Sequence, residues 1–468
     1  MLIGHRKFYE KDQSLFCEIS GDFNPLHSSP LEARKTIAGR QVVHGIHTFL
    51  WVLDLLVKNK KSIFQTYKIK FLKPVFLEEP VFCYWDEAKS LLTLKNDNEI
   101  TLLSMRCETP IQKPLVDVKF SIENEILKLD HPKNTKIGDL SQGDIFNDFC
   151  IGDIAQLRIL FADLSKVLGE YRIFEITRLS SIIGMQIPGL HSIFSECIIG
   201  FDENKIIPSC HIQKIEKRFN QVYLSYQGRN LHANLTAFFR PKPIKPESYD
   251  KIIEMVNLNI NLENLTVLII GGSRGLGAWT AKILAAIGAN IIITYNSGKV
   301  EATELINEIN KKSFGKAKSI QLDVNKFNID QIKEPIDHLY YFATPKIFGK
   351  QSDQFDDKIF QGFKEIYADK FFEISKSLIN NGLTKILYPS SVAIDEPIAS
   401  LEEYIQAKVL GEKQCIRLEK KFQINVFKPR IERVLTDQTA TILPVKSKDP
   451  FEVSMYLIHQ MLEIEKNE

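Results

Sequence analysis

Apolar residues occupy nearly every face of the segment 45–58, whereas the segments after it alternate between apolar and polar positions. A helix that is apolar all round is expected to be buried, and alternation is typical of strands with one buried face. The alternating runs, separated by turn residues, are Ser62–Phe76, Val81–Glu87, Leu91–Lys95 and Glu99–Cys107. This pattern predicts one buried helix wrapped by an antiparallel sheet over residues 1–125.

A fainter version of the same pattern returns later in the chain. Gly189–Phe194 is similar to Gly45–Phe49, so a second apolar helix is expected to begin at Gly189. Strand-like runs follow at Ser209–Ile215, Gln221–Tyr226 and Leu231–Phe239. They predict a second copy over residues 130–240, which would pair with the first because one such sheet leaves an open edge. An unrelated α+β domain is the alternative.

The pattern changes after Pro241–Pro246, whose prolines predict a semi-rigid linker over residues 241–262. Thr266–Ile270 is a continuous apolar run, as expected of a strand buried in a parallel sheet. A glycine-rich turn and the apolar helix Ala278–Ala286 follow, and then a second strand at Ile291–Thr294. Alternating strands and helices predict a doubly wound parallel sheet over residues 263–468.

The turn after the first of these strands has the composition of a dinucleotide-binding loop. Its glycines allow a tight turn and a close approach of the backbone to a pyrophosphate, which then faces the N-terminus of the next helix. The second strand lacks the Asp or Glu that binds a ribose 2′-hydroxyl, and an arginine stands in the loop, so we expect NADPH rather than NADH. The expected cofactor contacts are Gly271, Ser273, Arg274, Gly275, Leu276 and Gly277, with Asp323 and Val324 after the third strand.

Three more residues of this region suit hydride transfer. Tyr404 and Lys408 are four residues apart and share one helical face, where the ammonium group makes deprotonation of the phenol easier. Tyr404 can then exchange a proton with a hydroxyl while a hydride moves. Ser391, after the strand Lys385–Tyr388, is expected to hold the carbonyl oxygen. The tyrosine and the lysine are also expected to contact the cofactor.

Acid–base residues precede the buried helix of the first region. Asn24 is a preferred N-cap and Pro25 a preferred first helical residue, so a short helix should begin at Pro25. The positive end of this helix disfavours an imidazolium, which keeps His27 neutral and able to act as a base. With Asp22 just upstream, the pair suits removal of an α-proton and protonation of a leaving hydroxyl. Capping and packing of a turn is the alternative role.

The stretch Ile19–Pro30 and the opening of the buried helix resemble the MaoC-like (R)-specific enoyl-CoA hydratases over roughly the first 125 residues. The resemblance implies a hot-dog fold, in which the sheet wraps the helix, with Asp22 and His27 as the catalytic pair. Gly45 matches the start of the family's central helix, whose backbone N–H helps to hold the thioester oxygen.

Some residues differ from this pattern. Ser29 stands where an Asp is common in the motif, a position that we interpret as structural. The second copy has no equivalent of the catalytic motif over residues 161–172, and Pro188 replaces the histidine before its glycine, so we expect it to be catalytically silent. His44 and His47 are expected to pack or form hydrogen bonds.

The glycine loop, the serine and the Tyr-Lys pair together resemble the short-chain dehydrogenase/reductases, particularly β-ketoacyl reductases, over residues 264–440. Tyr341–Thr344 stands where the family has Asn-Asn-Ala-Gly, and Tyr367 stands at the position of its helix Asn. Pro429-Arg430 replaces Pro-Gly. These departures bear on efficiency, on the substrate lid and on the family's usual tetramer, but they leave hydride chemistry in place.

The composition limits the number of domains, the kinds of partner and the location to be expected. A chain of 468 residues, 44% hydrophobic and 25% charged, is expected to form two or three globular domains. Its net charge of +2 favours neither nucleic acid nor a membrane surface. The seven cysteines show no C-x-x-C pair, so we expect buried thiols rather than a metal cage or disulfides. Without a signal peptide or a long apolar run, no membrane insertion and a cytoplasmic location are expected.

These observations predict a multidomain α+β and α/β chain, with an N-terminal double hot dog followed by a Rossmann-type doubly wound parallel sheet. The expected function is a bifunctional ketoreductase/dehydratase of fatty-acid or polyketide-type biosynthesis that uses NADPH and acts on thioesters of acyl carrier protein or CoA. One alternative is an (R)-specific enoyl-CoA hydratase/3-hydroxyacyl-CoA dehydrogenase of fatty-acid degradation. The other is a dehydratase carrying an inactive, nucleotide-binding reductase scaffold. A homodimer is left open.

Overall fold

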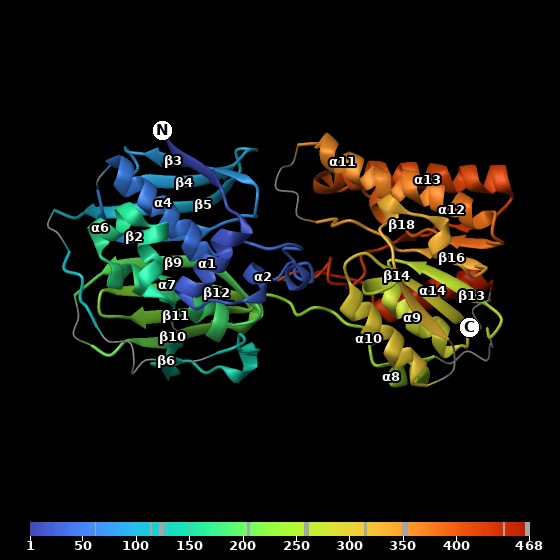
Figure 1. Cartoon of the computed structure of the whole chain (residues 1–468), viewed down its shortest axis with the longest axis horizontal. Coiled ribbons are helices and arrows are strands. Elements are labelled where there is room, and N and C mark those ends of the chain that lie inside the picture. Colours follow the sequence, from blue (N-terminus) through green and yellow to red (C-terminus); the bar gives the residue numbers. More distant parts are fainter. Residues whose placement is uncertain are drawn as a thin grey trace. The chain divides into compact units, whose positions relative to one another are not determined.

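The computed structural model describes the chain except residues 61, 113–114, 121–125, 128, 151, 204–205, 257–261, 313–315, 349–353, 443–444 and 464–468. It divides into two compact units, drawn in Figure 1. Unit 1 comprises Met1–Lys242 and Thr441–Pro444, and unit 2 comprises Pro243–Ala440 and Val445–Glu468.

Unit 1 is built on one sheet of ten strands in the order β1-β3-β4-β5-β2-β9-β12-β11-β10-β7. The two halves of the sheet have the same internal order and meet where β2 and β9 pair antiparallel. This is the predicted double hot dog. The strands are β1 Leu2–Lys7, β2 Phe64–Phe71, β3 Pro80–Asp86, β4 Leu91–Asn96, β5 Thr101–Pro110, β7 Ile145–Phe146, β9 Ser192–Phe201, β10 Ser209–Glu216, β11 Gln221–Gln227 and β12 Leu231–Phe239.

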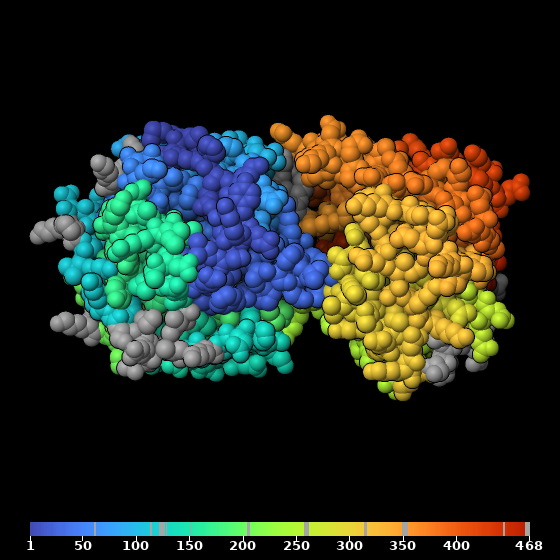
Figure 2. All heavy atoms as spheres, in the orientation of Figure 1, coloured from blue at the N-terminus to red at the C-terminus, as the bar shows by residue number. Residues whose placement is uncertain are grey.

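Each half of this sheet is filled by a long helix, and shorter helices precede it. As predicted, α4 is buried on most sides, and Phe49 and Leu53 within it are fully buried. Figure 2 shows the N-terminal segment, in blue, beside the turquoise segment that leads into the second half. The helices are α1 Glu10–Ser20, α2 Pro25–Ser28, α3 Pro30–Ala33, α4 Gly45–Lys60, α5 Leu157–Leu160, α6 Ala162–Leu168 and α7 Glu170–Ser181, which continues as the π-helical η4 Ile182–Gln186.

The central helix of the second half is α7 with η4, and it lies before Gly189 rather than after it. The residues that follow Gly189 form β9, so the prediction of a helix beginning there is wrong. The actual helix carries Arg172, Glu175 and Arg178, all buried. Because such residues are rarely buried completely, they concealed the central position of α7 in the sequence.

Unit 2 is built on a parallel sheet of six strands in the order β15-β14-β13-β16-β17-β19. This corresponds to the chain order 3-2-1-4-5-6 of a dinucleotide-binding fold, as predicted. The strands are β13 Thr266–Ile270, β14 Asn290–Tyr295, β15 Ala317–Gln321, β16 His338–Tyr341, β17 Lys385–Leu387 and β19 Asn425–Phe427, and a short pair is formed by β18 Ser390–Ser391 and β20 Arg430–Ile431.

Helices cover both faces of this sheet. Apolar side chains of α8, α9, α10 and α14 form one core, and those of α12 and α13 form another. The helix α8 lies within the span predicted as a linker and packs into the first core through Tyr249 and Ile252, so that part of the linker prediction is wrong. The helices are α8 Tyr249–Met255, α9 Gly275–Ala286, α10 Lys299–Asn310, α11 Asp357–Lys364, the π-helical η8 Glu365–Lys370, α12 Phe371–Ile379, α13 Glu402–Phe422 and α14 Pro450–Leu462. The apolar pattern predicts a last helix over residues 451–464, which α14 confirms as far as Leu462, and residue 464 lies outside the described residues.

All seven cysteines are buried and free, as predicted. Among the helices of the described residues, none combines the length and the apolar character that crossing a membrane requires.

Candidate active sites

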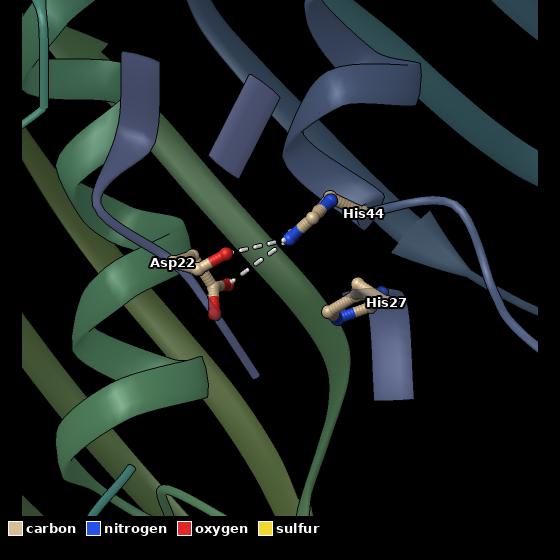
Figure 3. Close-up of side chains that lie close together, drawn as sticks. All are labelled: Asp22, His27 and His44. Carbon is tan, nitrogen blue, oxygen red and sulfur yellow. Dashed lines mark hydrogen bonds and ion pairs between the residues drawn. The ribbon is translucent and has the colours of Figure 1, made fainter. Parts of the chain in front are cut away.

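The first candidate site lies on the loop between α1 and α2, shown in Figure 3. As predicted, α2 begins at Pro25, and the Asn24 side chain caps it by accepting the N–H of Leu26 at 3.1 Å. This local structure places His27 in the first helical turn. The ring Nδ1 of His27 donates to the main-chain oxygen of Val42 at 2.6 Å, which leaves Nε2 as the basic nitrogen.

The environment of His27 keeps its imidazole neutral. Burial lowers the pKa of His27 to about 4, and the positive charge of Arg240 acts in the same direction, against the hydrogen bond to Val42. We expected the helix N-terminus to be the cause, whereas removal from water is the larger effect. The conclusion for the chemistry is the same, because a neutral imidazole can accept a proton.

Asp22 is fully enclosed, with 1% of its surface exposed. Its carboxyl group accepts hydrogen bonds from Ser180 Oγ at 2.7 Å and from the Asn24 N–H at 3.2 Å. Burial raises the pKa of Asp22 to about 7, against these two hydrogen bonds. Near neutral pH this carboxyl group can therefore either hold a proton or release it.

His44, the residue before α4, brings the two predicted residues together. Its ring stacks on that of His27 with centroids 3.8 Å apart, and its Nε2 lies 3.8 Å from Asp22 Oδ2 (Figure 3). The same Nε2 lies 3.1 Å from the Asp22 main-chain oxygen and Nδ1 lies 2.9 Å from the Gln13 amide oxygen, and the neutral ring can donate to one of the two. Burial lowers the pKa of His44 well below its usual value, with a further contribution from His27. His44 thus stacks and forms hydrogen bonds, while His47 stacks on Phe16.

Asp22, His27 and His44 each offer one ligand atom, and these three atoms lie within 4.8 Å of one another. That spacing is close enough to hold a metal ion. However, both ring nitrogens of His44 and Nδ1 of His27 already face protein oxygens. Metal-binding histidines need one nitrogen free for the ion. The arrangement therefore suits proton transfer better than metal binding.

The second half of unit 1 supplies contacts to this loop that the sequence did not reveal. Besides the Ser180 hydrogen bond, Asn24 Nδ2 donates to the main-chain oxygens of Gly184 at 2.8 Å and Gly189 at 3.0 Å. A Cβ on Gly184 would lie 2.2 Å from Asp22 Oδ1. Ser180 and Gly184 are one turn apart in an apolar stretch, and these two small residues were the available signal. The second half therefore contributes contacts to the first site in addition to completing the sheet.

Gly45 begins α4 and is packed against Phe71, whose ring carbon would be 3.0 Å from a Cβ. The first N–H groups of a helix have no partner within the helix. Gly45 therefore presents its N–H at the same helix start that carries His44, which is compatible with the predicted contact to a thioester oxygen.

The second candidate site begins with the glycine loop between β13 and α9. Gly271 and Gly275 have φ values of +80° and +58°, which favour glycine, and a Cβ on Gly277 would lie 2.3 Å from the Gly271 oxygen. The turn is closed by Thr294, whose hydroxyl accepts the Gly271 N–H at 3.2 Å. A loop of this shape before a helix of twelve residues fits a pyrophosphate.

Arg274, the residue predicted to favour a 2′-phosphate, caps α9 and lies in an ion pair. Its Nη1 is 3.6 Å from Asp437 Oδ2, and the other oxygen of Asp437 accepts the N–H of Ile244. Asp323 follows β15 and caps a short helix that begins at Val324. Both residues therefore lie at the carboxyl ends of the parallel strands, the edge of the sheet where dinucleotides bind. Their contacts in this structure are with protein atoms.

The three predicted hydride-transfer residues come together on α13 and the segment after β17. Burial raises the pKa of the Tyr404 phenol, and the side chain of Ser391 beside it acts in the opposite direction. Lys408 Nζ donates to the main-chain oxygen of Pro389 at 2.7 Å and lies 5.9 Å from the centre of the Tyr404 ring. Burial lowers the pKa of Lys408 to about 7, so the ammonium group can lose its proton near neutrality.

Tyrosines take the place of the family's amides around this lysine. Tyr367 on η8 presents its ring to Lys408 Nζ at 4.0 Å and shares a hydrogen bond with the Thr344 hydroxyl. Its main-chain oxygen accepts the hydroxyl of Tyr388 at 3.0 Å. Thr344 and Tyr367, two of the departures seen in the sequence, therefore contact each other beside the lysine.

The two units define a class of protein. One is a double hot dog with a buried carboxyl group beside an imidazole, and the other is a dinucleotide-binding domain with a Ser-Tyr-Lys group. Such a chain joins a hydratase or dehydratase to an oxidoreductase.

Comparison with known proteins gives the families. Residues 4–90 match the family described as "MaoC like domain", and residues 265–341 match "short chain dehydrogenase". The (R)-specific enoyl-CoA hydratase of Aeromonas caviae is 30% identical over 107 residues, which cover 22% of this chain and 77% of that protein. The chain belongs to the MaoC-like family, and its second unit is a short-chain dehydrogenase/reductase domain fused to the MaoC-like part.

Solved structures are also similar to part of the chain. The angucycline C-6 ketoreductase LanV, solved with bound NADP, is 16% identical with a TM-score of 0.39, covering 43% of this chain and 90% of that one. BdcA, solved in complex with NADPH, is 22% identical with a TM-score of 0.37, covering 42% of this chain and 86% of that one.

Proposed function

We propose that unit 2 reduces a 3-ketoacyl thioester with NADPH to the (3R)-hydroxyacyl thioester, and that unit 1 removes water from this product to give the trans-2-enoyl thioester. The observation that carries the proposal is the buried Asp22 carboxyl group beside the neutral His27 imidazole, in a chain that also holds Ser391, Tyr404 and Lys408 together. The first pair suits movement of water and the second group suits movement of a hydride.

In the dehydration, His27 Nε2 takes the α-proton of the hydroxyacyl group. The Gly45 N–H stabilises the negative charge that develops on the thioester oxygen. Asp22 gives its proton to the leaving hydroxyl, which departs as water. A carboxyl group with a pKa near the working pH is suited to this transfer, and its hydrogen bond from Ser180 orients it.

In the reduction, bound NADPH supplies the hydride to the 3-keto carbon. Ser391 and Tyr404 hold the carbonyl oxygen, and Tyr404 protonates it as the hydroxyl forms. Lys408 in its protonated form places a positive charge beside this phenol and so eases release of the phenolic proton. Gly271 and Gly277 allow the pyrophosphate to approach the backbone, and Arg274 would pair with the 2′-phosphate after leaving Asp437.

The roles assigned to Asp22 and His27 predict how dehydration depends on pH. His27 must be neutral, so activity should fall as pH drops through its pKa of about 4. Asp22 must be protonated, so activity should also fall as pH rises through about 7. A bell-shaped profile of kcat/KM between these values is expected for a (3R)-hydroxyacyl-CoA. A profile that rises up to pH 9 would show that Asp22 acts as an anion instead.

Two variants separate the two proposed activities. Purified protein is given NADPH and acetoacetyl-CoA, or the same acyl group on acyl carrier protein, and consumption of NADPH is followed. Tyr404→Phe should abolish this consumption while hydration of crotonyl-CoA persists, and Asp22→Asn should do the reverse. Comparison of the CoA and carrier-protein thioesters identifies the carrier, and a preference for the carrier protein would place the enzyme in fatty-acid or polyketide-type biosynthesis.

A second function has two observations in its favour. Arg274 is paired with Asp437, and the Tyr341–Thr344 segment replaces the family's usual residues beside the cofactor loop. A unit 2 that binds a nucleotide without reducing a substrate would act as a scaffold for the dehydratase. If the wild type and Tyr404→Phe are equally inert toward NADPH while crotonyl-CoA is hydrated, this second function is the correct one.

A further inference from the structure

Three successive turns of α13 are attached to the segment that carries Ser391. Tyr404 is in contact with Ser391, Lys408 Nζ donates to the Pro389 oxygen at 2.7 Å, and one turn further Glu412 accepts the hydroxyl of Ser390 at 2.6 Å. Residues four apart lie on one face of a helix. The first two attachments belong to the proposed reductase group, whereas the third has no role in the chemistry described above.

The Glu412 carboxylate is fixed from both sides. Its Oε1 also accepts Arg430 Nε at 2.9 Å, and its Oε2 accepts Arg430 Nη2 at 2.8 Å. Arg430 is itself the partner of Ser390 where β18 and β20 pair, and it forms a further ion pair with Asp395. A two-pronged arginine–carboxylate bond of this kind fixes direction as well as distance. The arginine occupies the position where the family has a glycine, so the clamp belongs to this chain.

We infer that Glu412, held by Arg430, is a positioning residue of the reductase site: through Ser390 it fixes the Pro389–Ser391 segment against α13, and so sets the distance from Ser391 to Tyr404 and the contact of Lys408 with Pro389. This inference rests on the proposed reductase function of unit 2. It adds a role for two residues that touch neither the substrate nor the cofactor.

Glu412 also acts on Lys408 through its charge. The groups that face the lysine from other elements are the rings of Tyr367 on η8 and Tyr388 after β17, and Cys415 faces it from α13. All three are uncharged at neutral pH, because burial raises the pKa of each. Glu412 is the anion that favours the protonated lysine, and its negative charge persists because Arg430 lowers its pKa.

The test compares Glu412→Ala and Glu412→Gln with Glu419→Gln. Glu419 lies on the same helix and pairs with Lys428 at 3.1 Å, so its variant is a matched control for loss of an ion pair on α13. Glu412→Ala frees the segment and should lower kcat for 3-ketoacyl reduction by about 10- to 100-fold, with KM and NADPH affinity changed less than about threefold. Glu412→Gln keeps an oxygen for Ser390 and should recover most of this rate.

Glu412→Gln should nevertheless change the pH profile. Reduction needs the protonated lysine, and removal of the negative charge lowers the pKa of Lys408, so the alkaline limb of kcat should move to lower pH. Glu419→Gln should leave both the rate and the limb unchanged. If Glu412→Ala behaves like this control while Tyr404→Phe is inactive, the reductase function stands and the positioning role is refuted.

The position of Lys408 can also be followed without turnover. In protein labelled with ¹³C at the lysine ε-carbons, the Lys408 resonance is identified by its loss in Lys408→Met and titrated against pH. A lower pKa in Glu412→Gln than in the wild type supports the positioning role even if the wild type does not reduce thioesters. Identical titrations in the two proteins would refute it, whatever the fate of the proposed function.

Discussion

The two hot dogs of unit 1 share a strand order but differ in the loop before the central helix. In the first half, this loop carries Asp22, Asn24 and His27 and ends at His44. In the second half, the corresponding stretch forms α5 and α6 without an acid–base pair. The second half nevertheless contributes Ser180 and η4 to the first site.

The contacts between the halves run in both directions. Ser180 on α7 donates to the Asp22 carboxyl group, and Asp54 on α4 accepts the N–H of Leu164 at the start of α6. Each central helix thus holds the loop region of the other half. One of these contacts orients a chemical group and the other caps a helix. A duplicated half can therefore lose its own chemistry and remain necessary for that of its neighbour.

The largest expected effect comes from removing the Asp22 carboxyl group, which belongs to the first half alone. Asp22→Asn should lower hydration of crotonyl-CoA by about 10²- to 10⁴-fold, the usual range for loss of a general acid or base. The carboxamide fits the same space, so the melting temperature should change little. A variant that retains more than a tenth of the activity would mean that the Asp22 carboxyl group is not the acid–base group of the first half.

A methyl group added to η4, in the second half, should displace the Asp22 carboxyl group of the first site. Gly184→Ala places a Cβ 2.2 Å from Asp22 Oδ1, and the carboxyl group must move. We expect kcat/KM for hydration to fall about 100-fold, as for a misplaced catalytic group. Gly138→Ala is the matched control, because nothing lies within 4 Å of a Cβ there. Equal activities in the two variants would disprove the contact.

Removal of the Ser180 hydroxyl should have a smaller effect that depends on pH. The hydrogen bond from Ser180 lowers the pKa of Asp22, so Ser180→Ala should raise that pKa. The alkaline limb of the dehydration profile then moves to higher pH. The plateau rate below that limb should fall by about tenfold, because the carboxyl group loses the hydrogen bond that orients it. Ser181→Ala, whose hydroxyl donates to the Arg178 oxygen instead, should leave the limb in place.

The smallest effect on activity is expected from the contact of Asp54 on α4 with Leu164 in the second half. Asp54→Ala removes the acceptor for the Leu164 N–H and should lower the free energy of unfolding by about 1 kcal/mol, as for loss of a helix cap. Hydration should change less than about threefold. The unfolding is measured with denaturant, followed by fluorescence. A loss of activity as large as that of Ser180→Ala would show that the two contacts are equivalent.

The local features of both units could be predicted from short stretches of sequence. Asn24 and Pro25 define the start of α2, and the apolar strand followed by glycines defines the Rossmann-type unit. These predictions depend on residues a few positions apart. The spacing of Tyr404 and Lys408 on one helix belongs to the same group.

Contacts between distant residues could not be predicted in this way. Ser180 and Asp22 are 158 residues apart, and the small residues Ser180 and Gly184 do not indicate which loop they contact. The position of α7 was also hidden, because Arg172 and Arg178 are buried in it and satisfied by local oxygens and aromatic rings. The pairing of Arg274 with Asp437 likewise depends on a loop far along the chain.

Both hot dogs lie in one polypeptide, and the antiparallel pairing of β2 with β9 joins their sheets. An enzyme assembled from two identical chains would receive every inherited change twice, once in each partner. Here a substitution in α7 affects only the one reaction centre of unit 1. A substitution in α4 does not introduce the same change into the second half. Because the lobes are tethered, this centre also stays complete at any dilution.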